Sequence, residues 1–242
     1  MLALPVVNRR LSGKLYWLTL LHHQFWRIFI KPTVTLNKLT WNSWLMNKFI
    51  SVCLIVFGIC FVAPAAANLD KPPTAAEKKA WPKVCQDRWE YGDNRKSPVV
   101  AKWRDILGED YVHLHHYCLG LNYVNRANRS WNNKQNKSYF LRKAVGNLEY
   151  MVTHTKQSFV LRPDVYVQLG KVYVQQGKIG DAIAQFQNAI RLKKDYSKAY
   201  IALSDLYKNN NNPSEALKVI EEGLIYSPDS RSLKRRQRKL SK

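Results

Sequence analysis

Residues 163–228 read PDVYVQLGKVYVQQGKIGDAIAQFQNAIRLKKDYSKAYIALSDLYKNNNNPSEALKVIEEGLIYSP, and one pattern occurs twice within them. An offset of 34 residues relates Tyr166, Leu169, Gly170, Tyr173, Ala182, Phe186 and Ala189 to Tyr200, Leu203, Ser204, Tyr207, Ala216, Ile220 and Gly223. The first four positions of each copy mark one amphipathic helix, and the last three mark a second. Turn-forming residues separate the two helices at 176–178 and at 209–213. The stretch therefore predicts two helical hairpins in register.

This spacing resembles that of the tetratricopeptide repeat, in which Leu-Gly-x2-Tyr is followed by Ala-x3-Phe-x2-Ala. Degenerate copies of both signatures recur upstream, at Leu119, Gly120, Tyr123, Ala144, Leu148 and Met151. The resemblance implies an all-α fold, an α-solenoid of about three helix pairs, because about three repeats are needed for a stable stack. In the degenerate repeat 21 residues separate Tyr123 from Ala144, where the later copies have nine. We therefore expect a polar loop insertion over residues 128–137.

Residues 68–242 divide into two parts. Residues 109–242 form the repeat domain, which ends in a capping helix whose Leu233 and Leu240 pack inward. Residues 68–108 form an N-terminal segment. In it we expect a flexible linker at 69–79, an aromatic stretch at 81–91 without helical period, and a helix from Ser97-Pro98 to Gly108.

Residues 46–67 resemble a secretory signal peptide. A short basic start is followed by the apolar run 49–63 and by small residues at Ala65 and Ala67, so the mature protein is expected to begin at Asn68. The run is short for a spanning helix, which needs about 20 residues, although a retained anchor is the alternative. Residues 1–45 are interpreted as an N-terminal extension from a mis-assigned start, with translation beginning at Met46; the alternative is a membrane-surface segment. The expected location is the periplasm, or the membrane facing it.

The charge balance is strongly basic, with 39 Lys and Arg against 17 Asp and Glu and a net charge of +22. Such a charge favours acidic partners such as nucleic acid, anionic lipid or polysaccharide. The basic residues are spread, because the first 69 residues hold seven without an acid and the last 12 hold seven more. This spread favours a solubilised surface over a dedicated polyanion site. A polyanion site on the basic C-terminal helix remains the alternative.

Two cysteines, Cys85 and Cys118, lie outside the leader. In an exported chain such a pair predicts a disulfide, which would stabilise the fold by about 3 kcal/mol. His113 and His116 lie three residues apart on a predicted helix and could share a metal ion. Their spacing matches no strong metal motif, so packing is favoured and no cofactor is expected.

Catalysis is not expected. The sequence has no Gly-rich phosphate loop, no Gly-x-Ser-x-Gly elbow and no acid pair in a recognisable setting.

The family resemblance also implies a partner-binding groove, lined by positions 2, 5, 9 and 12 of the first helix of each repeat. These positions are Asp164, Val167, Lys171, Val174, Lys198, Ile201, Asp205 and Lys208. Their mixture implies an extended peptide with apolar and acidic side chains. The favoured function is a protein–protein scaffold of the bacterial cell envelope. The alternatives are a polyanion-binding envelope protein and, third, a metal-binding protein.

Overall fold

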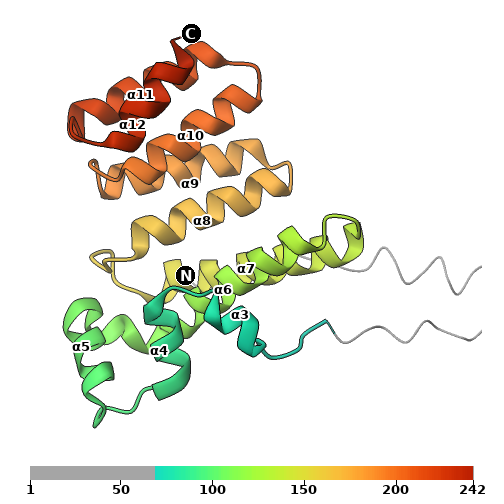
Figure 1. Ribbon diagram of the computed structural model, residues 1–242, viewed down its shortest axis with the longest axis vertical. Coiled ribbons are helices and arrows are strands. Elements are labelled where there is room, and N and C mark those ends of the chain that lie inside the picture. The colour runs from blue at the N-terminus through green and yellow to red at the C-terminus, as the bar shows by residue number, and fades with distance from the viewer. Residues whose placement is uncertain (1–68, 242) are drawn as a thin grey trace, which may run out of the picture. The chain divides into compact units, whose positions relative to one another are not determined.

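The computed structural model describes residues 69–241, and the N-terminal extension and leader predicted above lie outside this range. All regular elements of the described part are helices (Figure 1). They are α3 (Ala75–Lys79), α4 (Lys83–Tyr91), α5 (Pro98–Leu107), the 3-10 helix η1 (Gly108–His113), α6 (Leu114–Arg129), α7 (Lys134–His154), α8 (Arg162–Gln175), α9 (Ile179–Leu192), α10 (Ser197–Asn209), α11 (Pro213–Tyr226) and α12 (Arg231–Leu240). Among these residues no helix combines the length and the hydropathy that a bilayer crossing requires.

The helices form the predicted solenoid. Within the described range α6 pairs with α7, α8 with α9 and α10 with α11, and each hairpin packs on the next. Figure 1 shows the three hairpins one above another, with α12 against the last of them. Leu233 of α12 is fully buried and Leu240 packs against the same core, so the predicted capping helix is confirmed.

Small residues let paired helices approach closely. A Cβ atom added to Gly170 of α8 would lie 2.4 Å from a ring carbon of Phe186 in α9. At Gly120 of α6 an added Cβ would lie 2.8 Å from the side chain of Leu148 in α7. Both distances are too short for a side chain, so glycine at these positions sets the spacing within two consecutive hairpins.

The predicted loop insertion is wrong. The additional residues of the first hairpin lengthen its helices, since α6 has 16 residues and α7 has 21, against 14 in each of α8 and α9. Only residues 130–133 separate them. Helix α7 starts early because the Asn133 side chain accepts a hydrogen bond from the backbone N–H of Asn136. Its apolar stripe also begins early, at the buried Phe140 and Leu141.

The N-terminal segment is also more ordered than predicted. The expected linker contains α3, which begins with a capping box in which the side chains of Thr74 and Glu77 each bond the backbone of the other residue. The stretch expected to lack helical period forms α4, and the 3-10 helix η1 lies where the repeat domain is expected to begin. The helix at Pro98–Leu107 lies where the sequence predicts it.

Candidate functional site

The first helices of the three hairpins (α6, α8 and α10) are linked by one carboxylate. Asp164, in the first turn of α8, accepts a hydrogen bond from the Tyr117 hydroxyl of α6 at 2.7 Å. It accepts another from the hydroxyl of Tyr196, the residue before α10, at 2.6 Å. Lys198 of α10 places its Nζ 3.5 Å from the same carboxylate. One side chain therefore connects three consecutive hairpins.

Asp164 remains ionised although it is buried. Burial alone would raise the pKa of its carboxyl, but hydrogen bonds from Tyr196, Tyr117 and Gln168 and the charge of Lys198 outweigh burial and lower the pKa. Burial and the neighbouring carboxylate raise the pKa of Tyr117 and of Tyr196 well above the ordinary value. Both hydroxyls therefore keep their protons and act as donors at neutral pH.

The predicted groove residues fall into two groups. Asp164 and Val167 are buried, so the prediction that they face a partner is wrong. Asp164 is closed in by its two tyrosines, and Val167 belongs to the core shared by the last two hairpins. Asp205 is half-buried, and its two carboxylate oxygens lie 2.7 and 2.9 Å from the guanidinium nitrogens of Arg236 in α12.

The remaining five predicted residues, on α8 and α10, are exposed or partly exposed to solvent. Lys171, Lys198 and Lys208 are exposed. Val174 and Ile201 are half-buried and pack against the core with one side. We call these five residues the open groove surface.

Tyr117, Tyr196 and Arg236 were not predicted as site residues from the sequence. Tyr117 could have been found, because aligning Leu119-Gly120 on Leu169-Gly170 places it at the repeat position of Val167. Tyr196 lies just before α10, and Arg236 reaches Asp205 from the capping helix. Neither of these two matches a repeat position that could have indicated its role.

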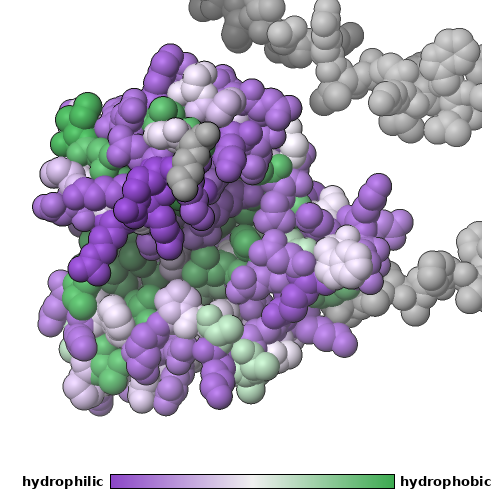
Figure 2. Space-filling model, turned by 45° about the horizontal axis from the view of Figure 1, so that its top comes forward, coloured by the Kyte–Doolittle hydropathy of each residue, from purple (hydrophilic) through white to green (hydrophobic). Residues whose placement is uncertain are grey.

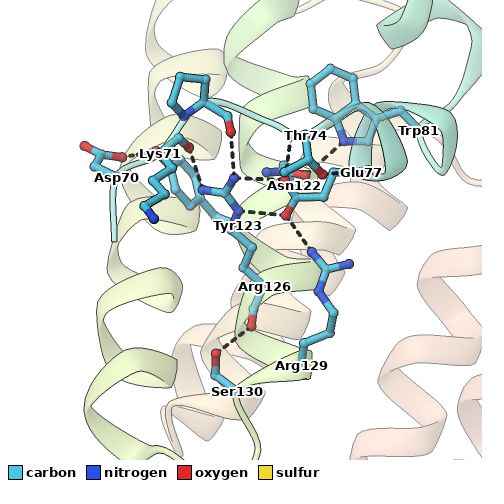
Figure 3. Close-up of polar contacts among 11 residues, drawn as sticks. Asp70, Lys71, Thr74, Glu77, Trp81, Asn122, Tyr123, Arg126, Arg129 and Ser130 are labelled. Carbon is cyan, nitrogen blue, oxygen red and sulfur yellow. Dashed lines mark hydrogen bonds and ion pairs between the residues drawn. The ribbon is translucent and has the colours of Figure 1, made fainter. Parts of the chain in front are cut away.

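A second polar cluster holds the N-terminal segment on α6 (Figure 3). Arg126 donates to both carboxylate oxygens of Glu77, at 2.8 and 2.9 Å, and to the carbonyl of Lys71 at 2.8 Å. Arg129 donates to Glu77 at 2.6 Å. The indole N–H of Trp81 donates to the Asn122 side chain at 3.2 Å. The segment before α4 therefore covers one side of α6.

A disulfide joins the same two parts of the chain. The Sγ atoms of Cys85 in α4 and Cys118 in α6 are bonded, which is the pairing that the sequence predicts. Both residues are buried in the first core cluster. The covalent bond and the polar cluster thus fix the N-terminal segment on the first hairpin.

Acid should weaken this attachment. Hydrogen bonds from Arg126 lower the pKa of Glu77 to about 2, from 4.5 in the unfolded chain, against the opposing effect of burial. Because the folded-state pKa is depressed, the contribution to stability is present above about pH 4.5 and is lost as the pH falls through 2. We expect Glu77→Gln to cost about 1–2 kcal/mol at neutral pH and to flatten the loss of stability between these values. Urea unfolding at a series of pH values measures both effects.

The matched control is Glu221→Gln, an exposed carboxylate of α11. Because this side chain is exposed, its substitution should change the free energy of unfolding at neutral pH by less than about 0.5 kcal/mol. A Glu77→Gln protein that loses as much stability on acidification as the wild type would contradict the assignment.

The histidines of α6 lie in a ring stack. The ring of His116 stacks on Tyr150 with centroids 3.7 Å apart, and Tyr150 stacks on His154 at 3.7 Å. Nδ1 of His116 donates to the Asn147 side chain at 3.0 Å. His116 therefore packs between helices, where the repeat pattern expects a large residue. Across residues 69–241 no group of three or more His, Cys, Asp or Glu is arranged to hold a metal ion.

Comparisons with known proteins find tetratricopeptide repeat proteins. Residues 163–240 match the family model of the tetratricopeptide repeat. Over 67 residues the chain is 36% identical to the chloroplastic tetratricopeptide repeat domain-containing protein PYG7 of Arabidopsis thaliana, which is 28% of this chain and 22% of that protein. The match thus spans less than a quarter of that relative.

Solved structures resemble the chain at low identity. A thermophilic TPR protein of Thermus thermophilus is 18% identical, with 65% of this chain and 88% of that chain covered and a TM-score of 0.48. The second TPR domain of human RPAP3, solved in complex with an HSP70 peptide, is 17% identical, with 52% and 98% covered and a TM-score of 0.36.

Proposed function

We propose that this chain, which carries tetratricopeptide repeats over residues 163–240, is a non-enzymatic scaffold that binds an extended segment of a partner protein. The binding site is the open groove surface of α8 and α10. The observation that carries the proposal is the presence there of three exposed lysines beside two half-buried aliphatic side chains. Of the three lysines, Lys171 and Lys208 make no ion pair within residues 69–241.

The chemistry of this surface favours a partner segment with acidic and apolar side chains. Exposed lysines steer and select acidic groups, which sets specificity and association rate. Val174 and Ile201 offer apolar area that a partner can cover. The Asp164 connection holds α6, α8 and α10 in fixed register, so the surface needs little ordering on binding.

The leader pattern of residues 46–67 supports a location in the cell envelope, in the periplasm or on the membrane facing it. A disulfide between Cys85 and Cys118 is in keeping with an oxidising compartment. The lack of a catalytic motif in the sequence supports a binding role.

Charge reversal in the groove tests the proposal. Lys171→Glu with Lys208→Glu should weaken capture of the partner from envelope extract by at least about tenfold, because two attractive charges become repulsive. The melting temperature should change by no more than about 2 °C, since both side chains are exposed. Affinity purification with the full chain and thermal unfolding provide the two readouts.

The control reverses two exposed lysines elsewhere, Lys79→Glu with Lys134→Glu. This variant has the same net charge as the groove variant and should capture the partner like the wild type. If the groove variant retains both capture and fold, the partner does not bind between α8 and α10.

A further inference from the structure

Helix α12 is held rigidly by its inner side. Leu233 is fully buried against the last hairpin, and Leu240 packs on the same core. The paired bonds from Arg236 to Asp205 add a polar attachment to α10. The Ser230 side chain caps the first turn. The helix therefore presents a defined outer face.

That outer face is uniformly basic. It carries the exposed residues Arg231, Lys234, Arg235, Arg238 and Lys239. Three of them, Arg231, Arg235 and Arg238, follow one another at intervals of four and three, which places them on one line along the helix. Lys234 lies 3.8 Å from Asp229, and within the described residues the other four form no ion pair. We call these five residues the basic face.

An apolar tip adjoins the basic face. Ile225 and Tyr226, at the end of α11, are 75% and 42% exposed, and four residues connect them to α12. Leu192, the last residue of α9, is 37% exposed, and three residues after it the carbonyl of Asp195 accepts a hydrogen bond from the Ser227 hydroxyl at 3.0 Å. Lys194 stands 5.2 Å from the Tyr226 ring. In Figure 2 a hydrophobic patch and the most hydrophilic surface are visible on the same face of the molecule.

We propose that the basic face and the apolar tip together dock on the surface of a lipid bilayer that contains anionic headgroups. The cations of a rigid helix match an anionic plane, and each is worth about a fivefold gain in binding near such a surface. Nucleic acid or polysaccharide would use the same cations, but neither gives an exposed isoleucine a place to bury. Aliphatic and tyrosine side chains gain free energy at the bilayer interface, which favours lipid.

Vesicle co-sedimentation with the full chain tests the charge contribution. Binding is compared on phosphatidylcholine vesicles with and without phosphatidylglycerol, so that the apolar residues 49–63, if retained, contribute equally to both. Arg231→Gln, Arg235→Gln and Arg238→Gln together should lower the phosphatidylglycerol-dependent affinity about 100-fold. Lys79→Gln, Lys102→Gln and Lys134→Gln remove the same charge elsewhere and should lower it less than about fivefold. Equal loss in the two variants would overturn the proposal.

A second variant separates lipid from other polyanions. Ile225→Ser changes an exposed side chain, leaves all charges in place and should weaken binding to phosphatidylglycerol vesicles about tenfold. It should leave retention on a heparin column unchanged. If Ile225→Ser binds the vesicles like the wild type while the triple arginine variant loses both ligands, the face is a general polyanion site and the bilayer proposal fails. Neither result depends on the groove, so failure here is distinct from failure of the scaffold proposal.

Discussion

Replacement of Phe186 by alanine should lower the free energy of unfolding by about 3–5 kcal/mol. Phe186 is 1% exposed and its ring lies directly on Gly170, which has no side chain to fill the space left behind. The cavity would lie between α8 and α9, in the middle of three hairpins that stabilise one another. Because each hairpin buries its apolar faces only against its neighbours, the loss should reach the whole solenoid. Denaturant unfolding of the oxidised protein at neutral pH gives the value.

Two control substitutions test whether the loss of stability comes from the loss of buried volume. Phe186→Leu retains much of the volume and should cost less than about 1.5 kcal/mol. Trp131→Ala removes a larger aromatic side chain that is 78% exposed, and it should change stability by less than about 0.5 kcal/mol. If the alanine variant at Phe186 behaved like the variant at Trp131, the contact between Phe186 and Gly170 would not hold the hairpin together.

The contact at Gly170 also shows why the fold could be predicted from the sequence. Gly170 and Phe186 recur 34 residues later as Ser204 and Ile220. This spacing is a local pattern, so it can be recognised without information about the rest of the chain. The capping helix was predictable for the same reason, since Leu233 and Leu240 lie one heptad apart. Apolar spacing identifies helices and their inner faces directly.

The lengthened first hairpin could not be predicted in this way. Residues 128–137 are polar, and a polar stretch fits either an exposed loop or the exposed turns of two longer helices. What decides between them is the capping bond at Asn133 and the burial of Phe140, whose ring stacks on Tyr123 of α6 with centroids 6.3 Å apart. The ion pair between Glu77 and Arg126 joins residues 49 apart, and no sequence spacing indicates it.

Some of the residues predicted to line a groove are buried, for a related reason. The repeat pattern assigns positions to a helix face. It does not indicate which of these side chains are buried by other residues of the same chain. Asp164 accepts hydrogen bonds from Tyr117, 47 residues before it, and from Tyr196, 32 residues after it. Val167 is covered by the core of the last two hairpins. Among the exposed lysines at these positions, Lys198 lies 3.5 Å from Asp164, and Lys171 and Lys208 form no ion pair within residues 69–241.

Substitution of Asp164 by alanine should cost about 3 kcal/mol. Hydrogen bonds to a buried charge contribute about 1.5–3 kcal/mol each, and the substitution leaves the hydroxyls of Tyr117 and Tyr196 without their acceptor. Lys198→Ala removes only an exposed cation 3.5 Å from the same carboxylate and should cost less than about 0.5 kcal/mol. Chemical denaturation of the two variants beside the wild type measures both. Equal costs for the two would show that the ion pair, and not the tyrosine bonds, holds Asp164.

The pH dependence of the Asp164→Ala effect identifies its cause. The pKa of Asp164 is lower in the folded protein than its ordinary value of 3.8. The ionised carboxylate therefore stabilises the fold above pH 3.8, and this stabilisation is lost as the pH falls through the folded-state pKa. The difference in unfolding free energy between wild type and Asp164→Ala should therefore narrow on acidification below about pH 3.8. A difference that stays constant down to pH 2 would mean that the side chain acts through packing alone. The carboxylate would then not be the group that holds α6, α8 and α10 in register beneath the open groove surface.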